Sequence, residues 1–363
     1  MFPNLPLWLL LLLSAAVAFV FAFLMTPPVK RFAEAIGAID VPTDDRRMHT
    51  DSVPRLGGLA IFLGFVLSML VFGQMTKPVM GMLVGAIIIV AMGALDDIID
   101  LNAWIKLAAQ IVAAIVAVRS GIIFNIVTSP FTSQPIQMGV FAVPITILWI
   151  VGCTNAVNLI DGLDGLAVGV SAISSLTMLI VALFVAQPEI AVILAALVGA
   201  CIGFMPYNLN PAKIFMGDVG SQFLGFTLAT VSLIGLFKLH AIISFLVPIM
   251  ALGVPLADTI SSFFRRILHG QSPFHADKGH FHHKLLQAGL TQKQAVAVLY
   301  GISAILGLVA IVLSESSMLV LIICVILIVC IILGLWLAIF RRNSKLQKRK
   351  SCKDSAETQT QEE

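Results

Sequence analysis

Charged residues are scarce in this sequence. Asp, Glu, Lys and Arg make up only 11% of its 363 residues, whereas a soluble domain carries roughly a quarter of such residues. Hydrophobic residues account for 59% of the chain, and the mean hydropathy is +1.03. This composition excludes an ordinary soluble protein. The net charge of +3 is spread over a few loops and the C-terminal tail, so no basic patch forms and we expect no nucleic-acid partner.

Paired cysteines and a secretory leader are also missing. The five cysteines form no CxxC pair and no zinc-finger spacing, so we expect them to pack as small hydrophobic side chains. The first apolar run, 7–25, has no basic segment before it, and Lys30 and Arg31 follow it at once. Since a secretory signal begins with basic residues, this run is predicted to remain as a transmembrane helix with its N-terminus outside.

Long apolar runs are what the sequence has instead. They predict an all-α, polytopic integral membrane protein with about eleven transmembrane helices. One membrane-embedded domain covers 1–340, and the polar composition of 341–363 predicts a disordered cytoplasmic tail. The predicted spans are 7–26, 56–74, 79–95, 106–120, 140–155, 166–186, 189–206, 220–236, 240–264, 293–313 and 317–340.

Basic residues indicate the orientation in the cell membrane. An odd number of spans that starts outside puts the Lys- and Arg-rich tail in the cytoplasm, as the positive-inside rule requires. The same threading places 27–55 and 265–292 inside, with most of the other loop cations. The opposite side holds few cations, and its loop 121–139 has the alternation typical of a short β-hairpin.

Five polar clusters fall on the cytoplasmic face of this threading. An ionised carboxylate at the bilayer centre costs roughly 2.5–3.5 kcal/mol, so we expect these residues at helix ends or along a watered cavity. The clusters are Asp96-Asp97-x-x-Asp100 with Lys106, Asn155-x-x-Asn158-x-x-Asp161-x-x-Asp164, residues 208–218, the Arg-rich loop 46–55 that ends at Arg55, and His280-x-His282-His283.

The first cluster brings two carboxylates and an ammonium to one short turn. Asp96 and Asp97 end the third predicted span, and Lys106 opens the fourth. Magnesium prefers oxygen ligands and is typically held by one or two carboxylates plus substrate phosphates, so the pattern is typical of a phosphate and metal site. A solvated helix cap with a loop salt bridge is the alternative.

The second cluster places amides and carboxylates on one stripe. Asn155, Asn158 and Asp161 recur every third residue, and the glycines Gly162 and Gly165 allow a sharp backbone at a helix start. An amide offers both donor and acceptor, which suits a base edge, a sugar hydroxyl or a metal's ligand shell. A polar seam between helices is the alternative.

Asp218 and the histidines complete the set. Asp218 follows Phe215-Met216-Gly217 at a helix entrance, where it could be only an N-cap. With the other carboxylates and cations it suits the neutralisation of a diphosphate in phosphoryl transfer. The histidine cluster suits a pyrophosphate. Zinc and a plain surface loop are its alternatives, although no zinc-site cysteines and no HExxH motif accompany it.

Five long motifs resemble, in order, those of the polyprenyl-phosphate N-acetylhexosamine-1-phosphate transferases. This family includes the enzymes that initiate wall teichoic acid and O-antigen synthesis. The resemblance covers about residues 27–290. The motifs are DVPTDDRRMHTDSVPRLGG at 40–58, DDIIDLNAWIKLAAQ at 96–110, NAVNLIDGLDGLA at 155–167, NPAKIFMGDVGS at 210–221 and HADKGHFHHKLL at 275–286.

The resemblance implies an activity and roles for the motif residues. A sugar 1-phosphate, usually N-acetylglucosamine 1-phosphate, passes from a UDP-N-acetylhexosamine to undecaprenyl phosphate, with release of UMP and with Mg²⁺, or Mn²⁺ as a substitute. By the family's pattern Asp218 binds magnesium, with Asn158 as a further ligand, and Phe215 stacks on uracil. Asp96 and Asp97 match paired aspartates near the reacting phosphates, as base or as positioning groups.

The histidines and Lys106 match phosphate contacts of the family. Lys278 departs from it, because many relatives carry arginine there, and arginine grips phosphate in a fork while lysine is a point charge. The candidate catalytic residues are therefore Asp96, Asp97, Lys106 and Asp161. The candidate substrate-binding residues are Asn155, Asp164, Phe215, His280, His282, His283 and Arg55. The candidate metal ligands are Asp218 and Asn158.

Other functions stay open at this point. The phospho-N-acetylmuramoyl-pentapeptide transferase of peptidoglycan synthesis is similar, but it usually has ten spans and the HxHH loop favours the first family. A secondary transporter also has many spans with polar residues, but it holds its binding groups near the bilayer midplane. The sequence does not decide between N-acetylglucosamine and its C4 epimer, the downstream polymer, or whether a homodimer forms.

The orientation can be tested at the tail. Ser344→Cys, in a cysteine-free background, introduces a thiol where we expect the cytoplasm. An impermeant thiol reagent should not label this variant in intact cells, because the membrane separates the reagent from a cytoplasmic thiol. The reagent should label the variant after permeabilisation. Labelling of intact cells would contradict the predicted orientation.

Overall fold

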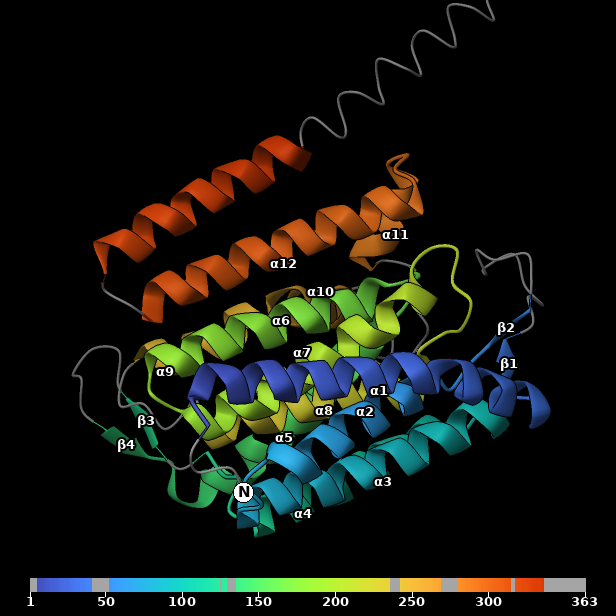
Figure 1. Cartoon of the computed structure of the whole chain (residues 1–363), viewed down its shortest axis with the longest axis horizontal. Coiled ribbons are helices and arrows are strands. Elements are labelled where there is room, and N and C mark those ends of the chain that lie inside the picture. The colour runs from blue at the N-terminus through green and yellow to red at the C-terminus, as the bar shows by residue number, and fades with distance from the viewer. Residues whose placement is uncertain are drawn as a thin grey trace, which may run out of the picture. The chain divides into compact units, whose positions relative to one another are not determined.

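The computed structural model describes residues 5–40, 52–124, 126–128, 135–235, 242–268, 280–314 and 317–335. The chain divides into two units, Met1–Ser316 and Ser317–Glu363. The first unit is a bundle of helices (Figure 1). The described part of the second unit contains the helix Met318–Leu335. The predicted disordered tail 341–363 lies outside the described residues, as do Lys278 and most of the Arg-rich loop 46–55.

Helices form almost all of the regular structure. They are α1 (Leu7–Ala35), α2 (Gly58–Phe72), α3 (Lys77–Ile99), α4 (Ala103–Arg119), α5 (Ala142–Leu159), α6 (Leu166–Phe184), α7 (Pro188–Asn208), α8 (Gly217–Gly235), α9 (Ile242–Ala251), α10 (Gly253–Leu268), α11 (Phe281–Gln287) and α12 (Gln292–Ser314), with a 3₁₀ turn, η1 (Gly139–Phe141), before α5.

Two short antiparallel hairpins accompany the helices. In the first, β1 (Ile39–Asp40) pairs with β2 (Val53–Pro54). In the second, β3 (Ile126–Thr128) pairs with β4 (Pro135–Gln137). The second confirms the hairpin predicted between 121 and 139.

Seven helices in the described part of the chain are long and apolar enough to cross a membrane. They are Leu7–Ala35, Lys77–Ile99, Gly139–Leu159, Leu166–Phe184, Pro188–Asn208, Gln292–Ser314 and Met318–Leu335. The predicted all-α, polytopic membrane architecture is therefore confirmed. Helices α2, α4 and α8 coincide with three further predicted spans. The count of eleven and the orientation of the termini stay predictions.

The helix predicted as one span over 240–264 is interrupted at Leu252, while its role as a span stays a prediction. Helix α9 ends at Ala251 and α10 begins at Gly253. Pro255 has no N–H to donate to the carbonyl of Ala251, four residues before it, so the helical ladder is interrupted there. The hydroxyl of the buried Ser174, on α6, donates to that carbonyl at 2.5 Å. A side chain from another helix thus replaces the donor that proline lacks.

Helix α8 forms the centre of the bundle. It contacts α2, α3, α5, α6 and α7, among which Figure 1 shows it. Every residue from Val219 to Gly235 is buried. An exposed helix would show a polar stripe, but after Asp218 and Gln222 α8 has only apolar or small side chains, which is typical of a helix surrounded by others. Its first turn, with Asp218, is thereby held in a fixed place.

Two glycines let the first turn of α8 approach its neighbours. A Cβ on Gly58, at the start of α2, would lie 2.1 Å from the Cα of Gly220. A Cβ on Gly93, in the second half of α3, would lie 2.7 Å from the Cα of Val219. Both clashes are with backbone, which cannot rotate away. These positions therefore set how closely α2 and α3 pack against α8.

The fold predicts a stability difference between two glycine substitutions. Gly93→Ala should lower the melting temperature in detergent, because overpacking against backbone typically costs about 1–3 kcal/mol. Gly152→Ala is the matched control on α5, where an added Cβ meets no atom within 4 Å. The control should leave the melting temperature unchanged or raise it, since alanine is the better helix former. Equal melting temperatures for the two variants would contradict the packing argument.

Candidate functional site

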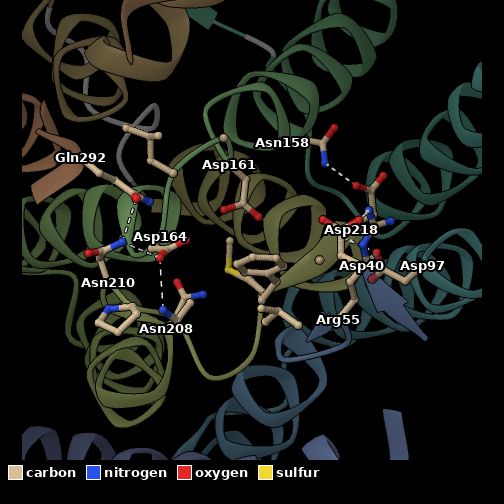
Figure 2. Close-up of a pocket in the computed structure, with 18 of the residues that line it drawn as sticks. Asp40, Arg55, Asp97, Asn158, Asp161, Asp164, Asn208, Asn210, Asp218 and Gln292 are labelled. Atoms are coloured by element: carbon tan, nitrogen blue, oxygen red, sulfur yellow. Dashed lines mark hydrogen bonds and ion pairs between the residues drawn. The ribbon is translucent and has the colours of Figure 1, made fainter. Parts of the chain in front are cut away.

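A cavity of about 630 Å³ lies where α3, α5 and α7 end and α8 and α12 begin. It is strongly acidic, and Arg55 is the one Lys or Arg side chain among its described lining residues. Five aspartates line it, namely Asp40, Asp97, Asp161, Asp164 and Asp218. Figure 2 shows these residues converging from segments that are far apart in the sequence. Each of the five polar clusters predicted from the sequence contributes at least one residue to this lining, and the histidine cluster contributes His283.

Asp218 is the most connected carboxylate of the cavity. Its Oδ1 accepts a hydrogen bond from Asn158 at 3.0 Å, and its Oδ2 accepts from Lys106 at 3.1 Å and from Gln222 at 2.8 Å. The Lys106 ammonium also lies 2.5 Å from Asp96. One ammonium therefore bridges two carboxylates, but they are Asp96 and Asp218, whereas the sequence predicted that Lys106 would face the pair Asp96 and Asp97.

The paired aspartates have different partners. Asp97 lines the cavity and accepts the backbone N–H groups of Asp218 at 3.1 Å and Val219 at 3.3 Å. These are among the first N–H groups of α8, which have no partner within the helix, and a carboxylate also stabilises the positive end of a helix. Asp96 is buried beside Lys106 and accepts the N–H of Leu101 at 2.8 Å. Asp97 thus holds the start of α8, while Asp96 holds Lys106.

Gly217 makes this approach feasible. Its φ of +70° lies in the left-handed region, and a Cβ there would lie 2.3 Å from Oδ2 of Asp97. Only glycine adopts this conformation at low cost and also leaves room for the carboxylate. The sequence Gly217-Asp218 therefore places one acidic side chain in the cavity and lets a second one cap the same helix.

Asp161 lies between the two polar ends of the cavity (Figure 2). No hydrogen bond from the described part of the chain reaches its carboxylate. Burial, together with the negative charges of Asp218, Asp97 and Asp164, raises the pKa of Asp161 to about 8. The neighbouring carboxylates therefore favour a proton on Asp161 at pH 7, and a cation bound among them would favour its release.

The far end of the cavity is built from amides. Asn210 donates to Asp164 at 2.9 Å and to Gln292 at 2.7 Å, which ties the loop before α8 to α12. Asn208 accepts the N–H of Gly165 at 3.1 Å. Asp164 therefore lines the cavity and also holds Asn210 in its wall. Gln292 and Asn210 also line the cavity, and the sequence analysis did not single out Gln292.

Arg55 and Phe215 form a third wall next to β2. Arg55 makes an ion pair with Asp40 at 2.5 Å. The N–H of Phe215 donates to the carbonyl of Pro54 at 2.8 Å, and the N–H of Gly57 donates to the carbonyl of Phe215 at 2.9 Å. These backbone bonds fix a half-buried aromatic ring in the lining of the cavity.

The three histidines pack together, as predicted, but they do not all face the cavity: the ring centroids lie 5.7 Å apart for His280 and His282 and 4.3 Å apart for His282 and His283. His283 lines the cavity. His280 is buried, and its Nδ1 lies 2.7 Å from the carboxylate of Asp258, which also accepts the N–H of Phe281. Asp258, which the sequence analysis missed, thus orients His280 and holds the start of α11. We find no local sequence signal that pairs them, because 22 residues separate the two.

His282 is buried between its neighbours and the turn after α5. Its side chain packs so closely that a Cβ on Gly162 would lie 2.5 Å from Nε2. Burial, and then the neighbouring His283 and His280, lower the pKa of His282 to about 4, against the opposing effect of Asp258. His282 is therefore neutral at pH 7 and supports the wall of the cavity.

Asn155 lies behind the cavity and is absent from its described lining. It pairs with Gln110, whose amide also reaches Gln222 on α8. Gln110 and Gln222 were not predicted as site residues. A signal for them exists, because each follows a predicted site residue, Lys106 or Asp218, by four positions and so shares its helix face.

The donor set at the acidic end fits magnesium. Within the described ranges, no three His, Cys, Asp or Glu side chains form a group that could hold a metal by themselves. Such a closed group is typical of structural zinc, whereas magnesium usually takes one or two carboxylates and completes its shell with water and substrate phosphates. Asp218 offers a carboxylate, and Asn158 offers an Oδ1 that accepts no hydrogen bond from the described residues. The negative charges around Asp161 favour a cation.

Comparisons with known proteins give consistent matches. Residues 79–236 match the family described as glycosyl transferase family 4. The chain is 42% identical over 311 residues to the probable undecaprenyl-phosphate N-acetylglucosaminyl 1-phosphate transferase of Bacillus subtilis (strain 168), covering 84% of this chain and 87% of the relative. It is 34% identical over 318 residues to the decaprenyl-phosphate N-acetylglucosaminephosphotransferase of Mycobacterium tuberculosis (strain ATCC 25618 / H37Rv), covering 79% and 78%.

A more distant relative has a related name. The undecaprenyl-phosphate alpha-N-acetylglucosaminyl 1-phosphate transferase of Escherichia coli (strain K12) is 29% identical over 305 residues, which cover 82% of each chain. The matches extend through most of the helical bundle, not only through the cavity motifs.

Burial of His282 predicts a dependence of stability on pH. Its pKa of about 4 in the folded protein lies below the ordinary value of 6.5, so the folded state favours the neutral ring. The stabilisation is complete above pH 6.5 and is lost as the pH falls towards 4, by up to roughly 3 kcal/mol. His282→Asn, which cannot protonate, should lose less in melting temperature between pH 7 and pH 4.5 than the unsubstituted protein. Parallel losses in both proteins would show that His282 is not buried as described.

Proposed function

This chain belongs to the polyprenyl-phosphate N-acetylglucosamine-1-phosphate transferase family, and we propose that it transfers N-acetylglucosamine 1-phosphate from UDP-N-acetylglucosamine to undecaprenyl phosphate. The products are UMP and the lipid-linked diphosphate sugar that starts a cell-envelope glycopolymer, such as teichoic acid or the O-antigen of lipopolysaccharide. The names of all three relatives contain N-acetylglucosamine, which supports this sugar. Their carriers differ between undecaprenyl and decaprenyl phosphate.

The acidic end of the cavity is the observation that carries the proposal. Asp97, Asp161 and Asp218 border it together, and Lys106 joins it through Asp218. Unaided, these carboxylates would repel a diphosphate. With a divalent cation they form the arrangement that phosphoryl transfer needs, in which positive charge from metal and lysine meets the charge of the phosphates.

Magnesium fits this end, with Asp218 as its carboxylate ligand and Asn158 as a further oxygen ligand. When bound, it would neutralise phosphate charge and polarise the phosphorus that is attacked. Two residues of the chain act beside it. Lys106 stabilises charge on the same phosphates, and Asn158 holds the Asp218 carboxylate in place from α5.

The structure favours a positioning role for Asp97 over the role of a base. A phosphate monoester has its second pKa near about 6, so most of the lipid phosphate already carries an attacking oxyanion at pH 7. The bond that forms joins this oxygen to the phosphorus next to the sugar, and the bond that breaks releases UMP. Both hydrogen bonds that Asp97 accepts come from the backbone of α8, so its carboxylate serves to hold Asp218.

The wall that contains Phe215 and the amide end suit the nucleotide sugar. Phe215 offers a ring for stacking on uracil, which is typical of nucleotide sites. Asp164, Asn210 and His283 offer polar groups near it in the same cavity. The nucleotide and the diphosphate would then lie in one cavity, with the diphosphate at the acidic end.

The cavity belongs, by this proposal, at the cytoplasmic leaflet of the membrane. UDP-sugars are soluble and the lipid phosphate lies at the membrane surface, so the two must meet there. The positive-inside distribution of Lys and Arg supports this side. The site residues lie at helix ends, which disfavours a transporter with its binding groups at the bilayer midplane.

One assay separates the candidate activities. Purified protein is incubated with Mg²⁺, undecaprenyl phosphate and one radiolabelled donor at a time, namely UDP-N-acetylglucosamine, its C4 epimer or UDP-N-acetylmuramoyl-pentapeptide. We expect UMP release and label in the lipid with UDP-N-acetylglucosamine, and loss of both after addition of a chelator. Label from the pentapeptide donor alone, or no label from any donor, would overturn the proposal.

Asp218→Asn tests the magnesium ligand. A metal contributes several kcal/mol of transition-state stabilisation, and each 1.36 kcal/mol is about tenfold in rate, so kcat should fall on the order of a hundredfold or more. An N-cap alone predicts almost no change, because asparagine caps as well as aspartate. Size-exclusion and melting curves control for folding. Near-normal turnover with normal magnesium dependence would return Asp218 to a structural role.

Phe215→Ala tests the nucleotide end. Loss of a stacking face typically costs about 1–3 kcal/mol of base binding, so the KM for the UDP-sugar should rise while kcat changes little. Steady-state kinetics at saturating undecaprenyl phosphate separate the two constants. A collapsed kcat with an unchanged KM would show that the ring does not bind uracil.

A further inference from the structure

Three amide side chains form a buried chain behind Asp218. Asn155 on α5, Gln110 on α4 and Gln222 on α8 connect three helices, and none of them lines the described cavity. Gln110 is 2% exposed and Gln222 is 1% exposed. Apolar side chains would pack in such a place without the cost of burying amides. A buried amide chain at this position therefore calls for an explanation.

The shorter hydrogen bonds of the three amides lead towards Asp218, and one longer bond runs the other way, from Nε2 of Gln110 to Oδ1 of Asn155 at 3.3 Å. Nδ2 of Asn155 donates to Oε1 of Gln110 at 2.6 Å. Nε2 of Gln110 donates to Oε1 of Gln222 at 2.9 Å, and Nε2 of Gln222 donates to Oδ2 of Asp218 at 2.8 Å. The three shorter bonds share one direction and end on a charged acceptor.

The direction follows from the carboxylate. An ionised carboxylate only accepts hydrogen bonds, so Gln222 must turn its NH₂ group towards Asp218 and its oxygen towards Gln110. Gln110 must then present its NH₂ group to Gln222 and its oxygen to Asn155. At the far end Asn155 is anchored by a second hydrogen bond, from Nδ2 to the carbonyl of Val151 at 2.8 Å. Each amide orientation is therefore determined by its neighbour.

We propose that Gln222 and Gln110 are positioning residues for Asp218, and that they hold its carboxylate in the orientation that binds Mg²⁺. Lys106 and Asn158 reach Asp218 as well, but one is shared with Asp96 and the other is itself a candidate ligand. The amide chain approaches instead from inside the bundle. Hydrogen bonds that orient metal ligands in this way typically contribute about 10–100-fold to metal affinity. The inference rests on the proposed function in one respect, the role of Asp218 as a magnesium ligand.

Metal affinity, measured without substrate, tests the inference. Mn²⁺ serves as the probe, with free Mn²⁺ followed by electron paramagnetic resonance, and Mg²⁺ competes for the site. Gln222→Met and Gln110→Met keep the side-chain length but remove the hydrogen bonds. Each should weaken Mn²⁺ and Mg²⁺ binding by about tenfold or more. Because the two residues act in series, the double variant should bind no more weakly than Gln222→Met.

A matched control separates this effect from general damage to α8. Thr230 lies on the same helix and is buried, and among the described residues its hydroxyl bonds only to the carbonyls of Phe226 and Thr227 in its own helix. Thr230→Val should leave metal affinity unchanged. Melting temperatures without metal check that all variants fold, and Gln222→Asn, whose shorter amide cannot span the same distance, replaces Gln222→Met if that variant does not fold.

Activity provides a second readout. For Gln222→Met the Mg²⁺ concentration at half-maximal rate should rise about tenfold, while kcat at saturating Mg²⁺ stays within a few-fold of the unsubstituted protein. A fall in kcat that saturating Mg²⁺ does not restore would overturn the inference.

The outcomes distinguish the inference from the proposed function. If Asp218→Asn binds Mn²⁺ as tightly as the unsubstituted protein, the magnesium role of Asp218 fails. If Asp218→Asn loses binding but Gln222→Met keeps it, only the positioning role fails. Additive losses in the double variant would also overturn it, because they would show that the two amides act independently.

Discussion

The start of α8 is the constraint on which the rest of the site depends. Asp97 accepts the backbone N–H groups of Asp218 and Val219, and Gly93 lets α3 approach the same turn. The carboxylate satisfies donors that no residue of α8 can reach, and it compensates the positive end of the helix. Since α8 is buried along its length, its first turn cannot move without disturbing the bundle. The core of the protein therefore places Asp218.

Charge imposes the second constraint. The carboxylates near the start of α8 outnumber Lys106, and Asp161 has no hydrogen bond from the described residues. Carboxylates held close together repel one another when no cation is bound. The same buried setting strengthens the attraction between a bound cation and a phosphate. A bound cation would offset the cost of gathering these carboxylates.

The polar residues divide between those that face the cavity and those that hold its walls. Asp218, Asn158 and Asp161 face it. His280 and Asn155 carry equally polar side chains, but their partners are Asp258 and Gln110, so they act through the residues that they orient. A buried hydrogen bond between two helices is costly to leave unmade, which makes these supporting pairs as sensitive to substitution as the cavity residues.

Much of this was predictable from the sequence, because hydropathy and residue spacing are local properties. The sequence by itself determined the membrane class, most helix positions, the family, and the meeting of Asp97, Asn158, Asp161 and Asp218 near one end of the bundle. Only the tertiary structure decided that His282 is buried, that 240–264 is broken at Leu252, and that Gln222 reaches Asp218. The partner of a side chain depends on how each helix is rotated and how closely its neighbours approach. Contacts between residues far apart in the chain set both, and no local pattern contains them.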